Sequence, residues 1–402
     1  MIKLNNGQQK IVNSAINWFY NSSEQVFQID GEAGTGKSVT MNSIVQSLRL
    51  KMDEILPMAF TGQAAIVMRT KGLRNATTLH SGLFDPVEVV MKDEHGNLII
   101  DKQFNTPVTK WEFIPKNFTN SKIKLMIVDE AWTAPLRFKK IIERHGIKVL
   151  VAGDSGQLPP VNDYPAYLTD GKIHHLTEFT RQAESSPLLY LAHRARMGKE
   201  IEYGLYGDKV LVISEDELNL DILSRGNIIL TAKNATRDRL NKLVREDILH
   251  INSKFPVYGE SVICKKNNWN KSIDNISLAN GLRGIVANMP NPLTYDKRDK
   301  TFEMDFIPDL LNNSFVGLKV NYPYYIGEKG IRDSLRNSPF TKGELFEPAY
   351  ASTVYSAQGS EYDSGIYIEE YMNPRTYFCQ NYTAITRFRD KLIYVKHTPK
   401  YW

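Results

Sequence analysis

The sequence predicts an α/β protein with two lobes, and three observations lead to this expectation. Short apolar runs alternate with helical patterns, a glycine-rich turn follows the first such run, and two stretches of different composition interrupt the alternation. Apolar strands that alternate with helices are typical of parallel sheets covered on both faces. We therefore expect two parallel sheets, each carrying a small inserted β-rich subdomain.

The strands are predicted from apolar runs that are bounded by polar or glycine-rich turns. In the first half these runs are Val26–Ile29, Leu125–Val128 and Val149–Ala152. In the second half they are Ile228–Ala232, Ile366–Ile368 and Leu392–Val395. Val39–Leu50 has apolar spacing near 3.6 and is predicted to be the helix after the first strand.

Two stretches break this rhythm. Residues 82–120 contain VEVVMKDEHGNLIIDKQF, in which two β-prone runs flank the polar turn DEHGN, so we expect an inserted β-hairpin. Residues 256–345 are rich in Asn, Pro, Gly and Tyr and contain the runs RGIVANM and VGLKVNY, which indicates a small all-β insertion. The first lobe is then 1–81 with 121–185, and the second is 186–255 with 346–402.

Composition sets broad limits on the protein. The chain has 402 residues, of which 42% are hydrophobic and 24% charged, with a net charge of +5. This balance permits a nucleic-acid partner without requiring one. Cys264 and Cys379 form no CxxC pair, so we expect reduced thiols. Because no signal peptide and no run of about 18 apolar residues is present, we expect no membrane association and a cytoplasmic location, in the host cell if a phage encodes the chain.

GEAGTGKS, at residues 31–38, is a complete phosphate-binding loop between a predicted strand and a predicted helix. Its backbone N–H groups can surround phosphate oxygens, Lys37 can approach the β- and γ-phosphates, and the hydroxyl of Ser38 can bind Mg²⁺. A glycine-rich helix entry without a ligand is the alternative. The nucleotide-contacting residues predicted here are Gly31, Ala33, Gly34, Thr35, Gly36, Lys37 and Ser38.

Asp129 and Glu130 follow a predicted buried strand. An acid at the end of such a strand can hold Mg²⁺, and a neighbouring glutamate can orient and deprotonate the attacking water. A lone Asp-Glu pair more often caps a helix, but the phosphate loop upstream favours the catalytic interpretation. ATP and Mg²⁺ are thus the expected cofactors.

The segment GDSGQLPPV, at residues 153–161, indicates which protein family the sequence resembles. Together with the phosphate loop and the acidic pair, it resembles the superfamily 1 DNA helicases, especially the RecD-like and phage Dda-like group. Further matches follow in the family's order, from LNNGQQ at 4–9 through AFTGQAA, TTLHS, LTEFTRQ and ASTVYSAQGSE to YTAITRFR at 382–389. Only the inserted stretches lie outside these matches.

This resemblance implies two RecA-like lobes with ATP between them and an SH3-like second insertion. It assigns adenine recognition to Gln8, γ-phosphate sensing to Gln157, arginine fingers to Arg181 and Arg387, and nucleotide contacts to Gly359 and Glu361. DNA-backbone contacts fall to Thr61, Thr78, His80 and Thr353. The residues also have ordinary interpretations, because arginines often form surface ion pairs, Gln157 could be a turn residue, and threonines often cap helices.

The sequence departs from the family pattern in two places. Tyr355 and Ser356 stand where the family commonly has His-Lys. A positively charged side chain that would contact the DNA backbone is therefore missing there. Trp132 replaces a small residue after the acidic pair. Neither change touches the predicted phosphate chemistry.

The expected function is an ATP-dependent DNA helicase or translocase on single-stranded DNA, with 5′-to-3′ polarity implied by the resemblance. Its substrates would be forked or tailed duplexes, and its partners replication, repair or recombination proteins. The hairpin near 87–103 is predicted to separate strands, with a stabilising insertion as the alternative. A translocase without unwinding, an RNA helicase and a P-loop kinase stay open as rival functions.

Overall fold

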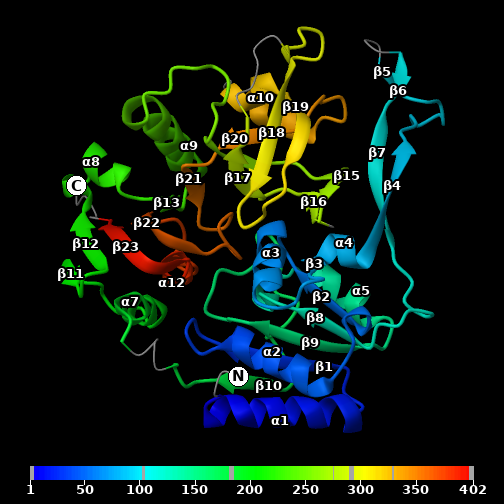
Figure 1. Cartoon of the computed structure of the whole chain (residues 1–402), viewed down its shortest axis with the longest axis vertical. Coiled ribbons are helices and arrows are strands. Elements are labelled where there is room, and N and C mark those ends of the chain that lie inside the picture. Colours follow the sequence, from blue (N-terminus) through cyan, green and yellow to red (C-terminus); the bar gives the residue numbers. More distant parts are fainter. Residues whose placement is uncertain are drawn as a thin grey trace.

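The computed structural model describes residues 4–101, 105–180, 185–274, 276–288, 294–327 and 330–397. Figure 1 shows the first lobe at the bottom, the second lobe at the left, a β-rich subdomain above them and a long ribbon at the right. The α/β class with parallel sheets is confirmed.

The first lobe is built on a six-stranded parallel sheet. Its strands, in spatial order, are β10 (Ile173–Leu176), β1 (Val26–Gly31), β9 (Lys148–Gly153), β8 (Leu125–Val128), β2 (Ile55–Ala59) and β3 (Thr77–Thr78). Its helices are α1 (Asn6–Asn21), α2 (Lys37–Leu48), α3 (Gly62–Thr70), α4 (Leu79–Leu83) and α5 (Lys139–Glu143).

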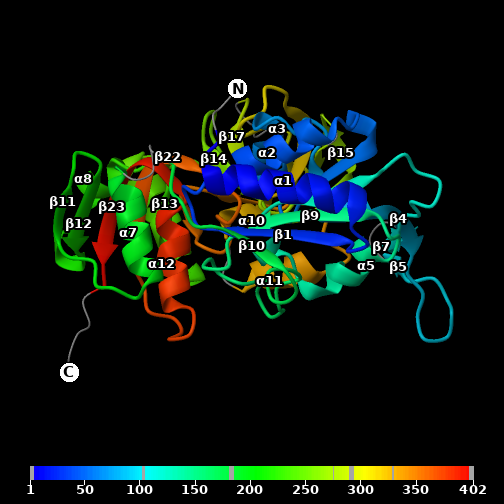
Figure 2. The same cartoon turned by 90° about the horizontal axis from the view of Figure 1, so that it is seen from below.

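The central strand β8 shows why this sheet forms. All its residues are fully buried, and they alternate between two cores. Leu125 and Ile127 pack with α1, α2 and α3, whereas Met126 and Val128 pack with α4 and α5. Figure 2 shows α1, α2 and α3 on one side of the sheet and α5 on the other. A continuous apolar run is therefore the expected signature of this strand, because both of its faces are covered.

The second lobe has a six-stranded sheet in which only the edge pair β11–β12 is antiparallel. The strand order is β11 (Gly204–Tyr206), β12 (Val210–Ser214), β23 (Phe388–Lys396), β22 (Tyr362–Ile368), β13 (Ile229–Thr231) and β21 (Ala351–Thr353). The helices are α7 (Pro187–Arg196), α8 (Leu220–Ser224), α9 (Asn234–Leu243) and α12 (Tyr377–Ile385).

The second insertion is an antiparallel sheet with its own aromatic core. Its strand order is β19 (Phe315–Asn321), β18 (Thr301–Pro308), β17 (Arg283–Val286), β14 (Ser261–Cys264) and β20 (Phe346–Pro348), and β15 (Asn268–Ile273) pairs with β16 (Ile276–Leu278).

The sequence-based description of this insertion is wrong in two details. Two short helices, α10 (Tyr322–Ile326) and α11 (Ile331–Asn337), show that it is not all-β. The strand β20, which was placed in the second lobe, pairs with β14 of the insertion. Neither a short capped helix nor a three-residue edge strand leaves a clear periodic signal.

The first insertion is a long two-stranded ribbon. β4 (Phe84–Val90) pairs in continuous register with β7 (Thr109–Pro115), and β5 (Ile100–Asp101) with β6 (Thr106–Pro107) extends the tip. The predicted turn at DEHGN forms, since the amide of Asp93 donates to the carbonyl of Asn97. The two flanking runs pair only next to this turn, at Lys92 and Leu98, whereas the main partner of the first run lies beyond residue 105. Residues 102–104 of the expected hairpin lie outside the described ranges.

In the part of the chain that the structure describes, no helix combines the length and apolar character needed to cross a bilayer. Cys264 and Cys379 are free thiols. Burial raises the pKa of Cys264 to about 12, so this thiol stays protonated and unreactive.

Candidate nucleotide and nucleic-acid site

The phosphate loop connects β1 to α2, and its shape depends on two glycines. Gly36 has a left-handed φ of 81°, and a Cβ there would collide with the amide of Gln8. A Cβ on Gly31 would lie 2.7 Å from the hydroxyl of Thr35. That hydroxyl in turn donates to the carbonyl of Glu32 at 2.7 Å and supports the loop from behind. Both positions therefore require glycine.

The loop opens onto a cleft of about 1140 Å³ between the two lobes. Ligand sites in proteins usually occupy roughly 300–1,000 Å³, so this cleft has room for a nucleotide. Most of the predicted loop residues line it, whereas Gly31 and Thr35 lie behind the wall. The loop residues on the wall are Ala33, Gly34, Gly36, Lys37 and Ser38.

The ammonium group of Lys37 is held against the phosphate loop by hydrogen bonds to backbone carbonyls. Its Nζ donates to the carbonyls of Gly31 at 2.6 Å and Glu32 at 3.1 Å. It also lies 3.9 Å from Oδ2 of Asp154, a carboxylate that is fully buried. The ammonium group is therefore positioned to move onto a phosphate without leaving the loop.

The acidic pair after β8 faces the same cleft. Burial and the neighbouring carboxylate of Glu130 raise the pKa of Asp129 to about 6. Oε2 of Glu130 is buried without a hydrogen-bond partner among the described residues. Crowded carboxylates with unused oxygen atoms fit a hard divalent cation, so Ser38 and Asp129 would be the residues to hold Mg²⁺.

Gln157 lies on the cleft wall with only 3% of its surface exposed. Within the described residues, its Oε1 has no hydrogen-bond partner. Nε1 of Trp132 donates to the Gln157 carbonyl at 2.8 Å, which fixes this turn beside the acids. Trp132, which departs from the family pattern, thus holds this turn in place, and Gln157 lies on the cleft wall with an unused amide oxygen.

The second lobe brings Arg387 to the opposite wall of the cleft. Arg387 is 4% exposed, and its guanidinium group donates to the carbonyl of Thr383 at 3.1 Å and the hydroxyl of Thr386 at 3.2 Å. Its Nη1 lies 3.9 Å from Oε1 of Glu130 in the first lobe. A residue near the end of the chain therefore meets the predicted catalytic base.

Two further predicted nucleotide contacts also tie the lobes together. Glu361 accepts from Lys71 of the first lobe at 2.7 Å and from Arg389. Burial alone would raise the pKa of Glu361, but Lys71 and Arg389 lower it to about 2. Gly359 has a φ of 78°, and a Cβ there would lie 2.6 Å from that of Ala64. Close approach of the lobes thus requires glycine at this position.

The side-chain amide of Gln8, which was predicted to recognise adenine, already forms hydrogen bonds within the protein. It forms a capping box with Asn5 at the start of α1, and its Nε2 donates to the carbonyl of Thr35 at 3.0 Å. Gln8 is 4% exposed and lines the cleft. It links α1 to the phosphate loop, and its role in recognising adenine stays a prediction. Arg181, the first predicted finger, lies outside the described residues.

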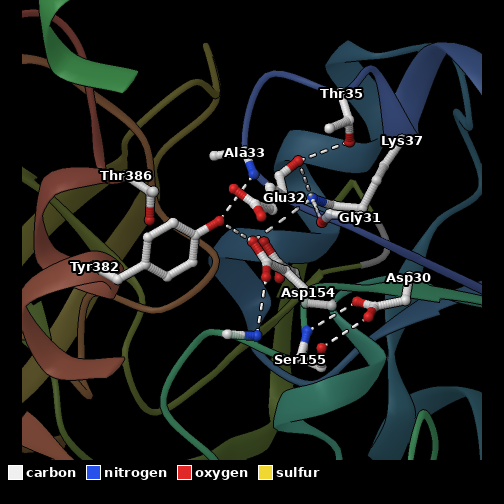
Figure 3. A network of polar contacts seen from close by, with 12 residues as sticks. Asp30, Gly31, Glu32, Ala33, Thr35, Lys37, Asp154, Ser155, Tyr382 and Thr386 are labelled. Carbon is white, nitrogen blue, oxygen red and sulfur yellow. Dashed lines mark hydrogen bonds and ion pairs between the residues drawn. The ribbon is translucent and has the colours of Figure 1, made fainter. Parts of the chain in front are cut away.

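Three residues that received no role from the sequence form a polar network beside the loop, and Figure 3 shows two of them, Asp154 and Tyr382. The carboxylate of Asp154 accepts hydrogen bonds from Arg196 of α7 and from the hydroxyl of Tyr382 of α12. Asp154 and Tyr382 both belong to matched motifs, but nothing in the sequence indicates that positions 228 residues apart would meet.

The model of the AAA domain family matches residues 3–215. The chain belongs to the AAA domain family. This membership implies nucleotide binding, in agreement with the phosphate loop and the cleft. No curated protein matches the chain.

Solved structures of Pif1 helicases have a similar fold over almost the whole chain. A structure describing DNA unwinding at forked double-stranded DNA by two coordinating Pif1 helicases has a TM-score of 0.56 at 18% identity, covering 99% of this chain and 94% of that chain. Pif1 from Bacteroides, in complex with ADP-AlF3 and single-stranded DNA, has a TM-score of 0.56 at 17% identity, covering 100% and 94%. Pif1 from Candida albicans has a TM-score of 0.51 at 18% identity, covering 98% and 95%.

The predicted resemblance to superfamily 1 DNA helicases is thereby confirmed at the level of fold. The two lobes are the RecA-like lobes that this resemblance implied. The roles of single residues at the site remain predictions.

Three of the predicted DNA contacts are threonines, and the hydroxyl of each accepts a hydrogen bond from a backbone amide three residues further along the chain. Thr61 caps α3 by accepting from the amide of Ala64 at 3.1 Å, and Thr78 caps α4 by accepting from that of Ser81 at 3.1 Å. Thr353 accepts from the amide of Ser356 at 3.3 Å. Thr61 and Thr78 thus have the ordinary capping role and Thr353 supports a turn, which leaves a contact to DNA untested.

His80 lies in an aromatic cluster instead of a charged groove. Its ring centroid is 5.0 Å from that of Phe138, 5.8 Å from Phe113 of the ribbon and 6.2 Å from Trp269 of the second insertion. Burial and nearby Arg137 lower the pKa of His80, so the ring is neutral at pH 7. It can pack or stack, but it carries no positive charge toward a phosphate.

Positive charge near Ser356 comes from other elements. Ser356 shares a small pocket with Lys265, which directly follows β14, and with Arg237 of α9. Their charged groups lie 3.7 Å and 3.6 Å from Oε2 of Glu347, which is 2% exposed. The cations of this pocket therefore balance a buried carboxylate as well as facing Ser356.

Proposed function

We propose that this chain is an ATP-driven DNA helicase or translocase that moves along single-stranded DNA and couples hydrolysis to strand separation. The observation that carries the proposal is the meeting of Arg387 and Glu130 across the cleft. Because the two residues come from different lobes, turnover depends on lobe closure. A cycle of closing and opening can then move the lobes along a strand.

The chemistry assigned to the cleft needs positioned charge more than covalent catalysis. Lys37 would neutralise the phosphates, Glu130 would orient and deprotonate water, and Arg387 would stabilise the charge that develops on the γ-phosphoryl group. Gln157 would respond to the presence of that group. Mg²⁺, held by Ser38 and Asp129, would supply further charge neutralisation.

DNA as the partner is supported by the fold shared with Pif1 helicases, whose structures include single-stranded and forked DNA. The ribbon β4–β7 would stand at the fork and separate the strands. The 5′-to-3′ polarity rests on the resemblance to the RecD-like group alone.

ATP hydrolysis measured with and without nucleic acid tests the proposal. Single-stranded DNA should stimulate turnover more than RNA of the same sequence. Glu130→Gln should bind ATP but hardly hydrolyse it, because the shape stays while the base is lost. Stimulation by RNA alone would favour an RNA helicase. No response to either nucleic acid would contradict the proposal and favour a P-loop kinase or a small-molecule ATPase.

Unwinding is tested separately from movement. We expect the chain to unwind a duplex with a 5′ single-stranded tail but not one with a 3′ tail. A translocase without unwinding is the second candidate, because most side chains of β4 and β7 are exposed, as they would be in a purely stabilising insertion. Displacement of streptavidin from single-stranded DNA without separation of any duplex would support it.

A further inference from the structure

Tyr382 places a hydroxyl from the second lobe on the backbone of the phosphate loop. The amide of Ala33 donates a hydrogen bond to this hydroxyl at 2.9 Å, and the hydroxyl donates to Oδ2 of Asp154 (Figure 3). Burial raises the pKa of Tyr382, and the nearby carboxylate of Asp154 raises it further. The hydroxyl therefore keeps its proton and can donate to Asp154 while it accepts from Ala33.

The amide of Ala33 is one of the groups that a phosphate loop offers to its ligand. Such loops bind anions through backbone N–H groups that converge on phosphate oxygens. One N–H cannot point fully at both a tyrosine hydroxyl and a phosphate oxygen, because a hydrogen bond weakens steeply as its angle departs from linearity. Tyr382 and a phosphate thus compete for Ala33.

Asp154 extends the competition to Lys37. Its Oδ2, which accepts from Tyr382, also lies 3.9 Å from Nζ of Lys37. Its Oδ1 accepts from Arg196, whose guanidinium group lies 5.3 Å from the centre of the Tyr382 ring. Two groups of the phosphate loop, an amide and an ammonium, are therefore directed toward a tyrosine–aspartate pair that joins the lobes.

We propose that Tyr382 is a positioning residue that holds the second lobe on the phosphate loop and must release Ala33 when a nucleotide phosphate binds. This inference rests on the proposed function and adds a residue to it. Phosphate binding then breaks one link between the lobes, so the free energy of binding is partly used to change their relative position. The residue couples nucleotide occupancy to lobe movement.

The test uses Tyr382→Phe in the full chain, because this change removes the hydroxyl and keeps the buried ring. The dissociation constants of a fluorescent ADP analogue and of pyrophosphate, the latter by competition, are measured without DNA. Since a net hydrogen bond contributes about 0.5–1.5 kcal/mol, losing the competitor should tighten both ligands by roughly 2- to 12-fold. In steady-state turnover, KM for ATP should fall without a rise in kcat.

Tyr367→Phe is the matched control. The hydroxyl of Tyr367 is also buried, donates to Asn381 at 2.6 Å and belongs to the same apolar core as Tyr382. Tyr367→Phe should lower the melting temperature about as much as Tyr382→Phe does, but it should leave the affinities for ADP and pyrophosphate unchanged.

The outcomes separate the two proposals. If the unaltered chain binds ADP but Tyr382→Phe binds it with equal or weaker affinity, the inference about Tyr382 is overturned and the proposed function stands. If Tyr382→Phe binds ADP more tightly but binds pyrophosphate with unchanged affinity, the inference is also overturned, because the hydroxyl must compete with a phosphate. If the unaltered chain binds neither ligand, the proposed function fails as well.

Discussion

The nucleotide cleft and the ribbon β4–β7 are both made from separated parts of the chain, but they are built on opposite principles. The cleft brings buried polar groups of two lobes together, and Arg387 and Asp154 are each less than 5% exposed. The ribbon is mostly exposed, and its contacts to the rest of the molecule include the aromatic cluster near its base and an ion pair between Asp101, near its tip, and Lys342. Hydrolysis in the cleft should therefore be sensitive to the loss of single side-chain groups. Unwinding by the ribbon should instead depend on the length of the ribbon and on how firmly its base is anchored.

Lys37→Ala should give the largest effect of any single change. The other loop groups that face the cleft carry no positive charge, so ATP turnover should fall to background. Steady-state hydrolysis at saturating ATP measures this. Lys10→Ala, an exposed lysine on α1, serves as the matched control and should behave like the unaltered chain. Normal turnover in Lys37→Ala would show that the phosphate site is wrongly assigned.

Arg387→Ala tests whether the second lobe takes part in the chemistry. Loss of an arginine that stabilises the transition state should lower kcat by on the order of 10³-fold. Arg225→Ala removes an exposed arginine of the same lobe, which pairs with Asp221, and should have little effect. Equal kcat values for the two variants would refute a catalytic site shared between lobes.

Shortening the ribbon should separate unwinding from hydrolysis. Val90 and Thr109 are directly paired, so an Asn-Gly turn can join them in place of residues 91–108. We expect most of the unwinding rate to be lost while DNA-stimulated hydrolysis is largely kept, because the cleft is untouched. Unwinding and hydrolysis are measured on the same preparation. An unchanged unwinding rate would mean that the ribbon is only a stabilising insertion.

Trp269→Ala should give the smallest effect and would sharpen the comparison most. The ring of Trp269 lies 5.5 Å from that of Phe113, so it connects the ribbon to the second insertion. An aromatic pair contributes about 0.5–1.5 kcal/mol beyond its buried area, so a loosened ribbon should unwind roughly 2- to 12-fold more slowly. Trp269→Phe should restore the rate. An effect on hydrolysis equal to that on unwinding would argue against a role in anchoring.

The sequence by itself determined the elements whose signals are local. Strand β8 was predicted with its observed bounds, because a strand buried on both faces must be apolar throughout. The phosphate loop was equally clear, since its glycines, Lys37 and Ser38 lie within eight consecutive residues. Both features follow from the chemistry of a short segment, whatever the rest of the chain does.

The partners of distant segments were decided only by the tertiary structure. The run at 98–100 was a reasonable partner for 87–91, yet continuous register with Thr109–Pro115 pairs the whole of β4, from Phe84 to Val90. Likewise, the meeting of Tyr382, Asp154 and Ala33 depends on how two lobes dock. Such contacts leave no mark in periodicity or composition, because their free energy arises only after both segments have folded and approached each other.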